Sequence, residues 1–310
     1  MNGGSEAAAP PARRLSAAVL IPFLVITLIW GSTWLVIRDQ LGVVPPSWSV
    51  TWRFLIASIV MFGWAAATRA PLRLPRRAWA ITIAIGLAQF VLNFNLVYRA
   101  EAYVTSGLVA VVFALLIVPN AVLGRIFLGE RLSARFLACS AVAMAGIALL
   151  FAHELQQDDA RVGATLLGIG LTLIAVLSAS AANVLQATAA ARAAPMASMM
   201  AWSMAIGTMA NGAWALATGG PPAFDLRPGY IAGLLYLGVA ASALAFMLYY
   251  RIIREIGAAR AAYSSVLIPI IAMGLSTVFE GYRWTWTAAA GGTLALAGLV
   301  AALSARRPAR

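Results

Sequence analysis

The stretch that decides the fold runs from Tyr98 to Ser133, YRAEAYVTSGLVAVVFALLIVPNAVLGRIFLGERLS, and is echoed from Leu248 to Arg283, LYYRIIREIGAARAAYSSVLIPIIAMGLSTVFEGYR. Three residues of the first copy recur 150 positions later (257 − 107 = 269 − 119 = 280 − 130): Gly107 as Gly257, Pro119 as Pro269, and Glu130 as Glu280. In both copies a proline interrupts an apolar segment, and a glutamate follows 11 residues later. This shared spacing predicts an internal duplication, which in a membrane chain is typical of transporters.

The composition predicts a helical membrane protein. Of the 310 residues, 62% are hydrophobic and only 10% are charged, whereas a soluble domain carries about 25% charged residues. Backbone groups in hydrocarbon must pair internally, so only helices and closed barrels span a bilayer. The apolar runs here are about 20 residues long and do not alternate with polar residues, as barrel strands would. We therefore expect helices in a lipid bilayer.

Ten spans are predicted, five on each side of the polar break His153–Arg161: Ala17–Ile37, Trp48–Ala67, Ala78–Tyr98, Val104–Leu123, Phe136–Ala152, Gly163–Ala190, Met196–Ala217, Tyr230–Tyr250, Ala259–Phe279 and Thr285–Ser304. The predicted organisation is a disordered N-terminus (1–16), a first five-helix repeat (17–152), a connecting loop (153–162), a second repeat (163–304) and a tail (305–310).

The arginines predict the orientation. The chain has no Lys, and its net charge of +12 is spread over short loops, which is a topology signal and gives no reason to expect a nucleic-acid partner. With the N-terminus in the cytoplasm, sixteen arginines fall in cytoplasmic segments and five on the other side. We therefore expect a protein of the bacterial inner membrane with both termini in the cytoplasm. Since each half has an odd number of spans, the halves insert as inverted repeats, with Glu130 at the cytoplasmic face and Glu280 at the outer face.

A family resemblance rests on particular residues: Trp30-Gly31-Ser32, Arg53, Pro119 and Leu128-Gly129-Glu130-Arg131-Leu132-Ser133. With these, the first half resembles an EamA-type repeat of the drug/metabolite transporter superfamily. The second half keeps Pro269 and Glu280 but has Glu280-Gly281 where the family shows a Gly-Glu pair. Gly146 and Gly298 align at an offset of 152, which places a two-residue insertion after the glutamate loop.

The resemblance covers residues 17–304 and implies a transporter of small metabolites. Within the superfamily the chain looks most like the YddG-type exporters of aromatic amino acids. The family sets a transporter class and no substrate. The resemblance implies no cofactor, and because the two halves are fused, we expect the protein to function as a monomer.

Catalytic and metal-binding patterns are absent from the sequence. His153 is the sole histidine and lies in the central loop, and no carboxylate pair, His–Glu–His motif or cysteine cluster occurs. We therefore expect neither an enzyme nor a metal site. All ten carboxylates lie in loops or at span ends. Since a proton-coupled carrier often has a buried acid, this favours facilitated transport.

Polar residues on two spans are candidates for binding. Gln89 and Asn93 share one helical face with Gly86 and Val97, and Asn183 repeats the pattern in the sixth span. These amides either face a wet cavity and bind the substrate or form hydrogen bonds between helices. The residues alone leave both interpretations open.

Aromatic residues supply the other binding candidates: Trp30, Trp34, Phe90, Tyr236 and Tyr263. Such residues hold a ring by stacking and a cation by cation–π attraction, whereas many Trp and Tyr near span ends belong to the interfacial belt.

Three further residues carry alternatives. Arg53 lies about five residues inside its span, roughly 7–8 Å from the outer headgroups at about 1.5 Å per residue, and we favour snorkelling to that surface over a cavity charge that attracts a substrate carboxylate. Pro119 and Pro269 bend equivalent spans and are either paired hinges that gate one cavity or fixed kinks.

The sequence thus predicts an exporter of aromatic or large apolar amino acids that works by alternating access. The alternatives are a carrier of another amphipathic or cationic compound, a carrier of a nucleotide sugar, which needs several basic residues in its cavity, and a membrane scaffold or enzyme without transport.

Overall fold

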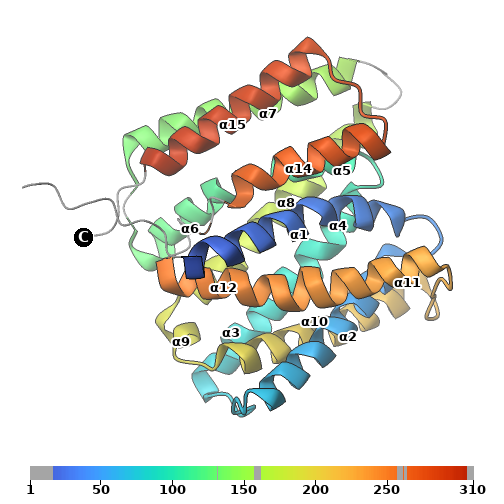
Figure 1. Ribbon diagram of the computed structural model, residues 1–310, viewed down its shortest axis with the longest axis vertical. Coiled ribbons are helices and arrows are strands. Elements are labelled where there is room, and N and C mark those ends of the chain that lie inside the picture. Colours follow the sequence, from blue (N-terminus) through green and yellow to red (C-terminus); the bar gives the residue numbers. More distant parts are fainter. Residues whose placement is uncertain (1–16, 131, 157–161, 257–260, 262–263, 306–310) are drawn as a thin grey trace, which may run out of the picture.

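The computed structural model describes residues 17–130, 132–156, 162–256, 261 and 264–305, and within these ranges the regular structure is entirely helical (Figure 1). The first half contains α1 (Ala17–Asp39), α2 (Pro46–Ala67), α3 (Arg76–Ile85), η1 (Gly86–Asn93), α4 (Phe94–Ala100), α5 (Ser106–Phe113), η2 (Ala114–Leu116), α6 (Ile117–Leu128) and α7 (Ala134–Gln156). The second half contains α8 (Val162–Gln186), α9 (Ala189–Arg192), α10 (Met196–Gly219), α11 (Pro228–Leu235), η4 (Tyr236–Leu244), α12 (Ala245–Ile256), α14 (Ser264–Phe279) and α15 (Trp286–Ala305). The predicted N-terminal segment and Tyr263 lie outside the described residues.

The helical class predicted from composition is confirmed. Six described segments are long and apolar enough to cross a membrane: Ile21–Asp39, Pro46–Ala67, Arg76–Ala100, Ser106–Leu128, Val162–Gln186 and Pro228–Arg254. Three shorter apolar helices accompany them: Ala134–Leu150, Leu267–Phe279 and Trp286–Ala302. Prolines open several helices, where the missing N–H removes no intrahelical bond: Pro46 begins α2 and Pro228 begins α11.

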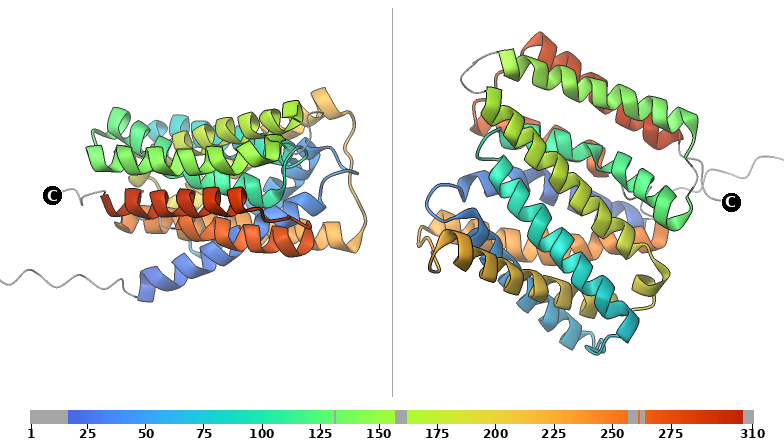
Figure 2. Two further views of the ribbon diagram at one scale, coloured as in Figure 1. Left: turned by 90° about the horizontal axis from the view of Figure 1, so that it is seen from above. Right: turned by 180° about the vertical axis from the view of Figure 1, so that it is seen from behind.

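The helices pack in a pattern that is unchanged when the two halves are exchanged. α7 packs on α15 at one edge of the bundle, and α2 packs on α10 towards the other (Figures 1 and 2). Between these pairs, α1 of the first half contacts α14 and α12, while α8 of the second half contacts α6 and α4. Each half therefore places its first helix among the third and fourth segments of the other half.

Both halves contain a π-helical stretch at the same place. η1 and η4 interrupt the third long segment of their halves and begin 150 residues apart (236 − 86). In such stretches the hydrogen bonds run from i to i+5. Three backbone carbonyls of these stretches accept hydrogen bonds from the other half: Ala88 O from Ser178 Oγ (2.8 Å), Phe90 O from Asn211 Nδ2 (2.8 Å) and Ala241 O from Trp30 Nε1 (3.1 Å).

α6 and α14 end in the same turn. Gly129 and Gly281, which follow these helices, adopt left-handed φ angles of 70° and 69°, a conformation that glycine permits. The residue after each glycine donates its N–H back into the helix over 3.2 Å, from Glu130 to Gly124 O and from Tyr282 to Ser276 O.

This shared turn corrects the predicted alignment. Its residues are 152 positions apart (281 − 129 = 282 − 130), so Tyr282, and not Glu280, occupies the place of Glu130. The two additional residues lie before the turn, between Pro269 and Gly281, because the glycine follows Pro119 by 10 residues (129 − 119) and Pro269 by 12 (281 − 269). The predicted equivalence of Glu130 and Glu280 is wrong, as is the prediction that the insertion follows the glutamate loop.

Glycines bring α7 and α15 into backbone contact. A Cβ at Gly146 would lie 2.3 Å from Ala295 N, and one at Gly298 would lie 2.5 Å from Ala143 N. Close approach of this kind at small residues is how helices associate without a hydrophobic driving force in lipid. The glycines aligned at an offset of 152 in the sequence therefore face one another's helices in the fold.

Replacing Gly146 by Ala is expected to lower the free energy of unfolding by about 1–3 kcal/mol, because the added methyl group meets backbone that cannot yield. The loss should appear as a lower melting temperature of the purified protein in detergent. The matched control is Gly170→Ala in α8, where nothing lies within 4 Å of an added Cβ. Equal melting temperatures for the two variants would contradict this account of the α7–α15 contact.

Candidate functional site

A cavity lies between the two halves. It encloses about 790 Å³ of space not occupied by atoms, the part open to solvent included. Its wall comes from seven segments: Trp30, Thr33, Trp34 and Ile37 from α1; Arg53 from α2; Gln89, Asn93, Phe94 and Val97 from η1 and α4; Ala110, Phe113, Ala114 and Leu116 from α5 and η2; Ala179 and Asn183 from α8; Phe246 and Tyr249 from α12; and Ile268 from α14.

Aromatic rings form one side of the cavity. The Trp30 ring centroid lies 4.9 Å from that of Tyr249 and 5.2 Å from that of Phe246, both in edge-on arrangements. Trp34, one helical turn after Trp30, lies 5.3 Å from Phe113. Rings in such arrangements present flat and edge surfaces to a further ring at separations of about 4.5–7 Å. The hydrogen bond from Trp30 Nε1 to η4 fixes the orientation of this wall.

Amide side chains form a polar side. Gln89 and Asn93 come from η1, and Asn183 from α8 approaches Asn120 Oδ1 with its Nδ2 at 3.5 Å. Asn93 Oδ1 is buried and has no hydrogen-bond partner among the described residues. The predicted polar face thus meets the cavity at Gln89, Asn93 and Val97, whereas Gly86 packs against the α10 backbone, with Ser203 O 2.8 Å from an added Cβ.

Arg53 overturns the favoured prediction that it snorkels to a headgroup surface. Its exposure is only 1%. The Nε atom donates to Ser242 Oγ of η4 (2.9 Å), and the guanidinium carbon lies 4.3 Å from the Phe94 ring centroid in a cation–π contact. Ser242 lies within the bundle, and its hydrogen bond holds the Arg53 side chain inward. The position of Arg53 along α2 does not indicate this contact. The alternative prediction, a charge at the cavity, describes where the side chain lies.

Five of the eight predicted binding residues line the cavity: Trp30, Trp34, Gln89, Asn93 and Asn183. Phe90 does not, since it is fully buried between the rings of Phe54 and Phe246.

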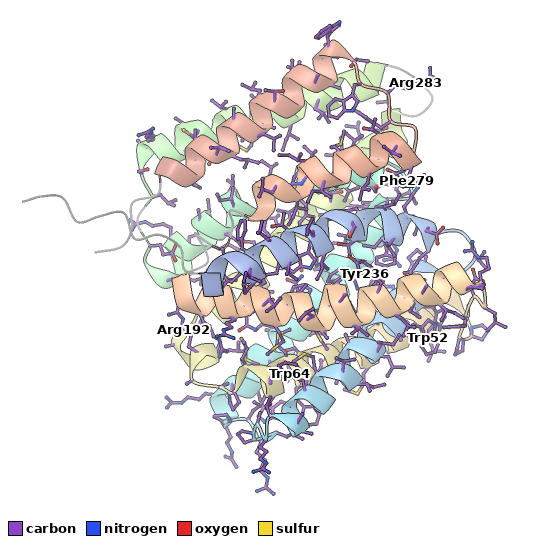
Figure 3. The ribbon with its side chains drawn as sticks, viewed as in Figure 1. Trp52, Trp64, Arg192, Tyr236, Phe279 and Arg283 are labelled. Atoms are coloured by element: carbon purple, nitrogen blue, oxygen red, sulfur yellow. The ribbon has the colours of Figure 1, made fainter. Side chains whose placement is uncertain are left out.

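Tyr236 also lies outside the cavity wall. It is on the η4 surface that faces α1 (Figure 3), where its hydroxyl is 2.7 Å from Ser32 Oγ and donates to Ile29 O at 3.1 Å. Its polar group is therefore engaged between helices. Tyr263 falls outside the described residues.

Phe246 and Tyr249 line the cavity but are not among the predicted binding residues. Their spacing of three places both rings on one face of α12, and this is the signal in the sequence that identifies them. The prolines differ in setting: Pro119 is the third residue of α6, directly after the 3-10 turn η2, whereas Pro269 lies inside α14.

A cluster of charged residues lies at the end of the bundle where α1, α4 and α14 finish, which we call the Glu101 end. Glu101 is fully buried there, and neither carboxylate oxygen has a hydrogen-bond partner among the described residues. Its backbone carbonyl accepts from Arg38 Nη1, and Arg38 Nε also lies 3.8 Å from Glu280 Oε1. Glu280 accepts from Ser106 Oγ at 2.7 Å and from Ser276 Oγ.

Burial raises the pKa of the Glu101 carboxyl well above its usual range, and the negative charge of Glu280 raises that pKa further. Arg38 and Arg53 act in the opposite direction and do not cancel these effects. Tyr98 is the other titratable group that interacts with the carboxyl. The buried arrangement of Glu101 is therefore most stable with its carboxyl protonated.

Comparisons with known proteins concern the sequence and the fold of this chain. The model of the EamA-like transporter family matches the chain twice, over residues 17–152 and 166–304. The chain is similar to the probable amino-acid metabolite efflux pump of Salmonella typhimurium (26% identity; 89% of this chain and 91% of that protein). It is also similar to Protein PagO of the same organism (24% identity; 87% of each) and to the probable amino-acid metabolite efflux pump of Escherichia coli (24%; 89% and 91%).

One solved crystal structure superposes on the fold with a TM-score of 0.69. It covers 94% of this chain and 99% of the other, at 22% identity. A likeness at this identity concerns the arrangement of the helices alone.

Replacing Glu101 by Gln is expected to remove a pH-dependent part of the stability. Because the carboxyl's pKa is higher in the folded protein than in the unfolded chain, the folded state binds more protons, and its stability falls as pH rises from the ordinary carboxylate range through the raised pKa. The advantage in melting temperature of Glu101→Gln over the wild type should therefore grow between about pH 5 and about pH 8.

The control is Asp39→Asn, an exposed carboxylate at the end of α1. A constant difference between Glu101→Gln and the wild type across this pH range would show that Glu101 keeps its ordinary titration.

Proposed function

Because the chain belongs to the EamA-like transporter family, as its sequence predicts, we propose that it exports aromatic or large apolar amino acids across the inner membrane by alternating access. A family of transporters with several membrane-spanning helices implies a multi-pass membrane protein that carries small metabolites. The narrower substrate class is supported by similarity to two proteins named as probable amino-acid metabolite efflux pumps.

The observation that carries the substrate class is the aromatic wall of the cavity. Trp30, Phe246 and Tyr249 line the space between the halves with ring surfaces on which a further ring would stack, and other residues of the wall offer amides and one cation. A nucleotide sugar would need several basic groups for its phosphates, whereas Arg53 is the one basic residue among the described residues that line the cavity. A cationic compound would meet the positive charge of Arg53 in a medium of low dielectric.

We further propose ten membrane spans in two inverted five-helix repeats. Three observations support this: the family model matches twice, the π-helical stretches begin 150 residues apart, and the helix neighbours are unchanged on exchange of the halves. Arg192 and Arg283 lie at opposite ends of the bundle (Figure 3). With both termini cytoplasmic, the Glu101 end faces outward, and Pro119 and Pro269 are hinges of the segments that gate the cavity.

Transport is proposed to follow the gradient of the substrate itself, because no carboxylate lines the cavity in the described part of the chain. Proteoliposomes loaded with labelled phenylalanine or tryptophan should release the label faster than protein-free vesicles, with no imposed pH difference. Release at the protein-free rate across a panel of amino acids would contradict the substrate class. Release that requires a proton gradient would contradict facilitated transport and leave the substrate class intact.

The inverted topology is open to a labelling test. In a Cys139→Ala background, single cysteines replace Ala134, the first residue of α7, or Arg283, in the connection after α14; both positions are exposed. In intact cells a membrane-impermeant maleimide should label Arg283→Cys and spare Ala134→Cys until the cells are opened. Labelling of both cysteines from the outside would place the two connections on the same side and contradict inversion.

A further inference from the structure

Three buried polar atoms of the cavity wall have no hydrogen-bond partner among the described residues: Trp34 Nε1, Arg53 Nη1 and Asn93 Oδ1. The first two are donors, one of them on a cation, and the third is an acceptor. Buried polar groups in proteins are nearly always paired, so three unpaired atoms in the wall of one cavity indicate partners that arrive with a ligand.

Arg53 is the strongest of the three indications. Its charge is inside the membrane-spanning part of the protein, yet no carboxylate of the described residues forms a salt bridge with it. The side chain is already anchored, since Ser242 holds Nε and the Phe94 ring covers the guanidinium face. This anchoring fixes the orientation of the guanidinium N–H donors before a ligand arrives, and a positioned guanidinium binds carboxylates well.

Asn93 supplies a hydrogen-bond acceptor to the same cavity. The Phe54 ring, next to Arg53 in α2, packs at 4.9 Å on Phe94, next to Asn93 in the chain, so the two binding residues come from adjoining segments. A carbonyl oxygen without a donor is suited to an ammonium group, which offers three N–H bonds and accepts none. Trp34 Nε1 adds a neutral donor for the second oxygen of a carboxylate.

We propose that the cavity binds the zwitterionic head of an α-amino acid, with Arg53 and Trp34 holding the carboxylate, Asn93 holding the ammonium group, and the Trp30–Phe246–Tyr249 wall holding the side chain. This rests on the proposed export function and specifies the substrate class as zwitterions. A compound that carries only one of the two charges leaves a buried group of the site unpaired, so the site discriminates against it.

Ligand-induced shifts in melting temperature of the purified full-length protein test this, because a ligand stabilises the state that binds it. The probes are L-phenylalanine, phenylpropionate, which lacks the ammonium group, and phenethylamine, which lacks the carboxylate. The wild type should bind each truncated probe roughly ten- to hundredfold more weakly than L-phenylalanine, as expected for the loss of one charge-assisted hydrogen bond.

Variants assign the two charges to their residues. Arg53→Gln should abolish the preference for L-phenylalanine over phenethylamine, and Asn93→Leu should abolish the preference for L-phenylalanine over phenylpropionate. Arg254→Gln is the matched control: this half-buried arginine lies outside the cavity wall and donates to Ala191 O at 3.0 Å and Ala194 O at 3.4 Å. It should keep both preferences.

The outcomes separate the two proposals. Wild-type protein that binds phenethylamine as tightly as L-phenylalanine overturns the zwitterion site and leaves an amino-acid exporter in place. Protein that binds none of the three probes and no other amino acid overturns the export function together with the site. If Arg53→Gln does not fold, the wild-type comparison and Arg53→Lys, which keeps the charge and loses the fork, decide the carboxylate subsite.

Discussion

The structure depends on hydrogen bonds by which side chains of one half bind backbone carbonyls in the π-helical stretch of the other half. Because hydrocarbon holds no water to replace such a bond, its loss is costly. In this protein the partners come from the opposite half: Ser178 and Asn211 bond to η1, and Trp30 bonds to η4. Each half therefore completes the hydrogen bonding of the other, and the seam along which they do so runs beside the cavity.

The positions of the proposed binding side chains depend on these contacts between the halves. Gln89 and Asn93 are part of η1, while Arg53 is held by Ser242 of η4. A movement of one half against the other must remake some of these bonds, so the geometry of the site and the relative position of the halves are linked. Within the proposed alternating-access cycle, this link ties substrate release to the movement that opens the cavity.

The sequence predicted what depends on regular periodicity and missed what depends on its interruption. The helical class followed from composition, and the family followed from the resemblance at motifs such as Trp30-Gly31-Ser32. Gln89 and Asn93 followed from one face of a helix. Phe90 lies within η1 and is covered by Phe54 and Phe246. Arg53 was placed by counting residues from a span end, and the count carries no information about Ser242. Equivalence of Glu130 and Glu280 failed because α14 gains two residues before its terminating turn.

Arg53 and Glu101, two buried ionisable groups without bonded partners of opposite charge among the described residues, lie along one line of polar contacts. The Tyr98 hydroxyl interacts with Arg53 and donates to Gln40 Oε1 at 3.0 Å, near the Glu101 end of α1. The Arg53 charge favours ionisation of Glu101, whereas burial and Glu280 oppose it. Through Tyr98, the cation of the cavity wall is therefore in contact with the end of the bundle that holds Glu101.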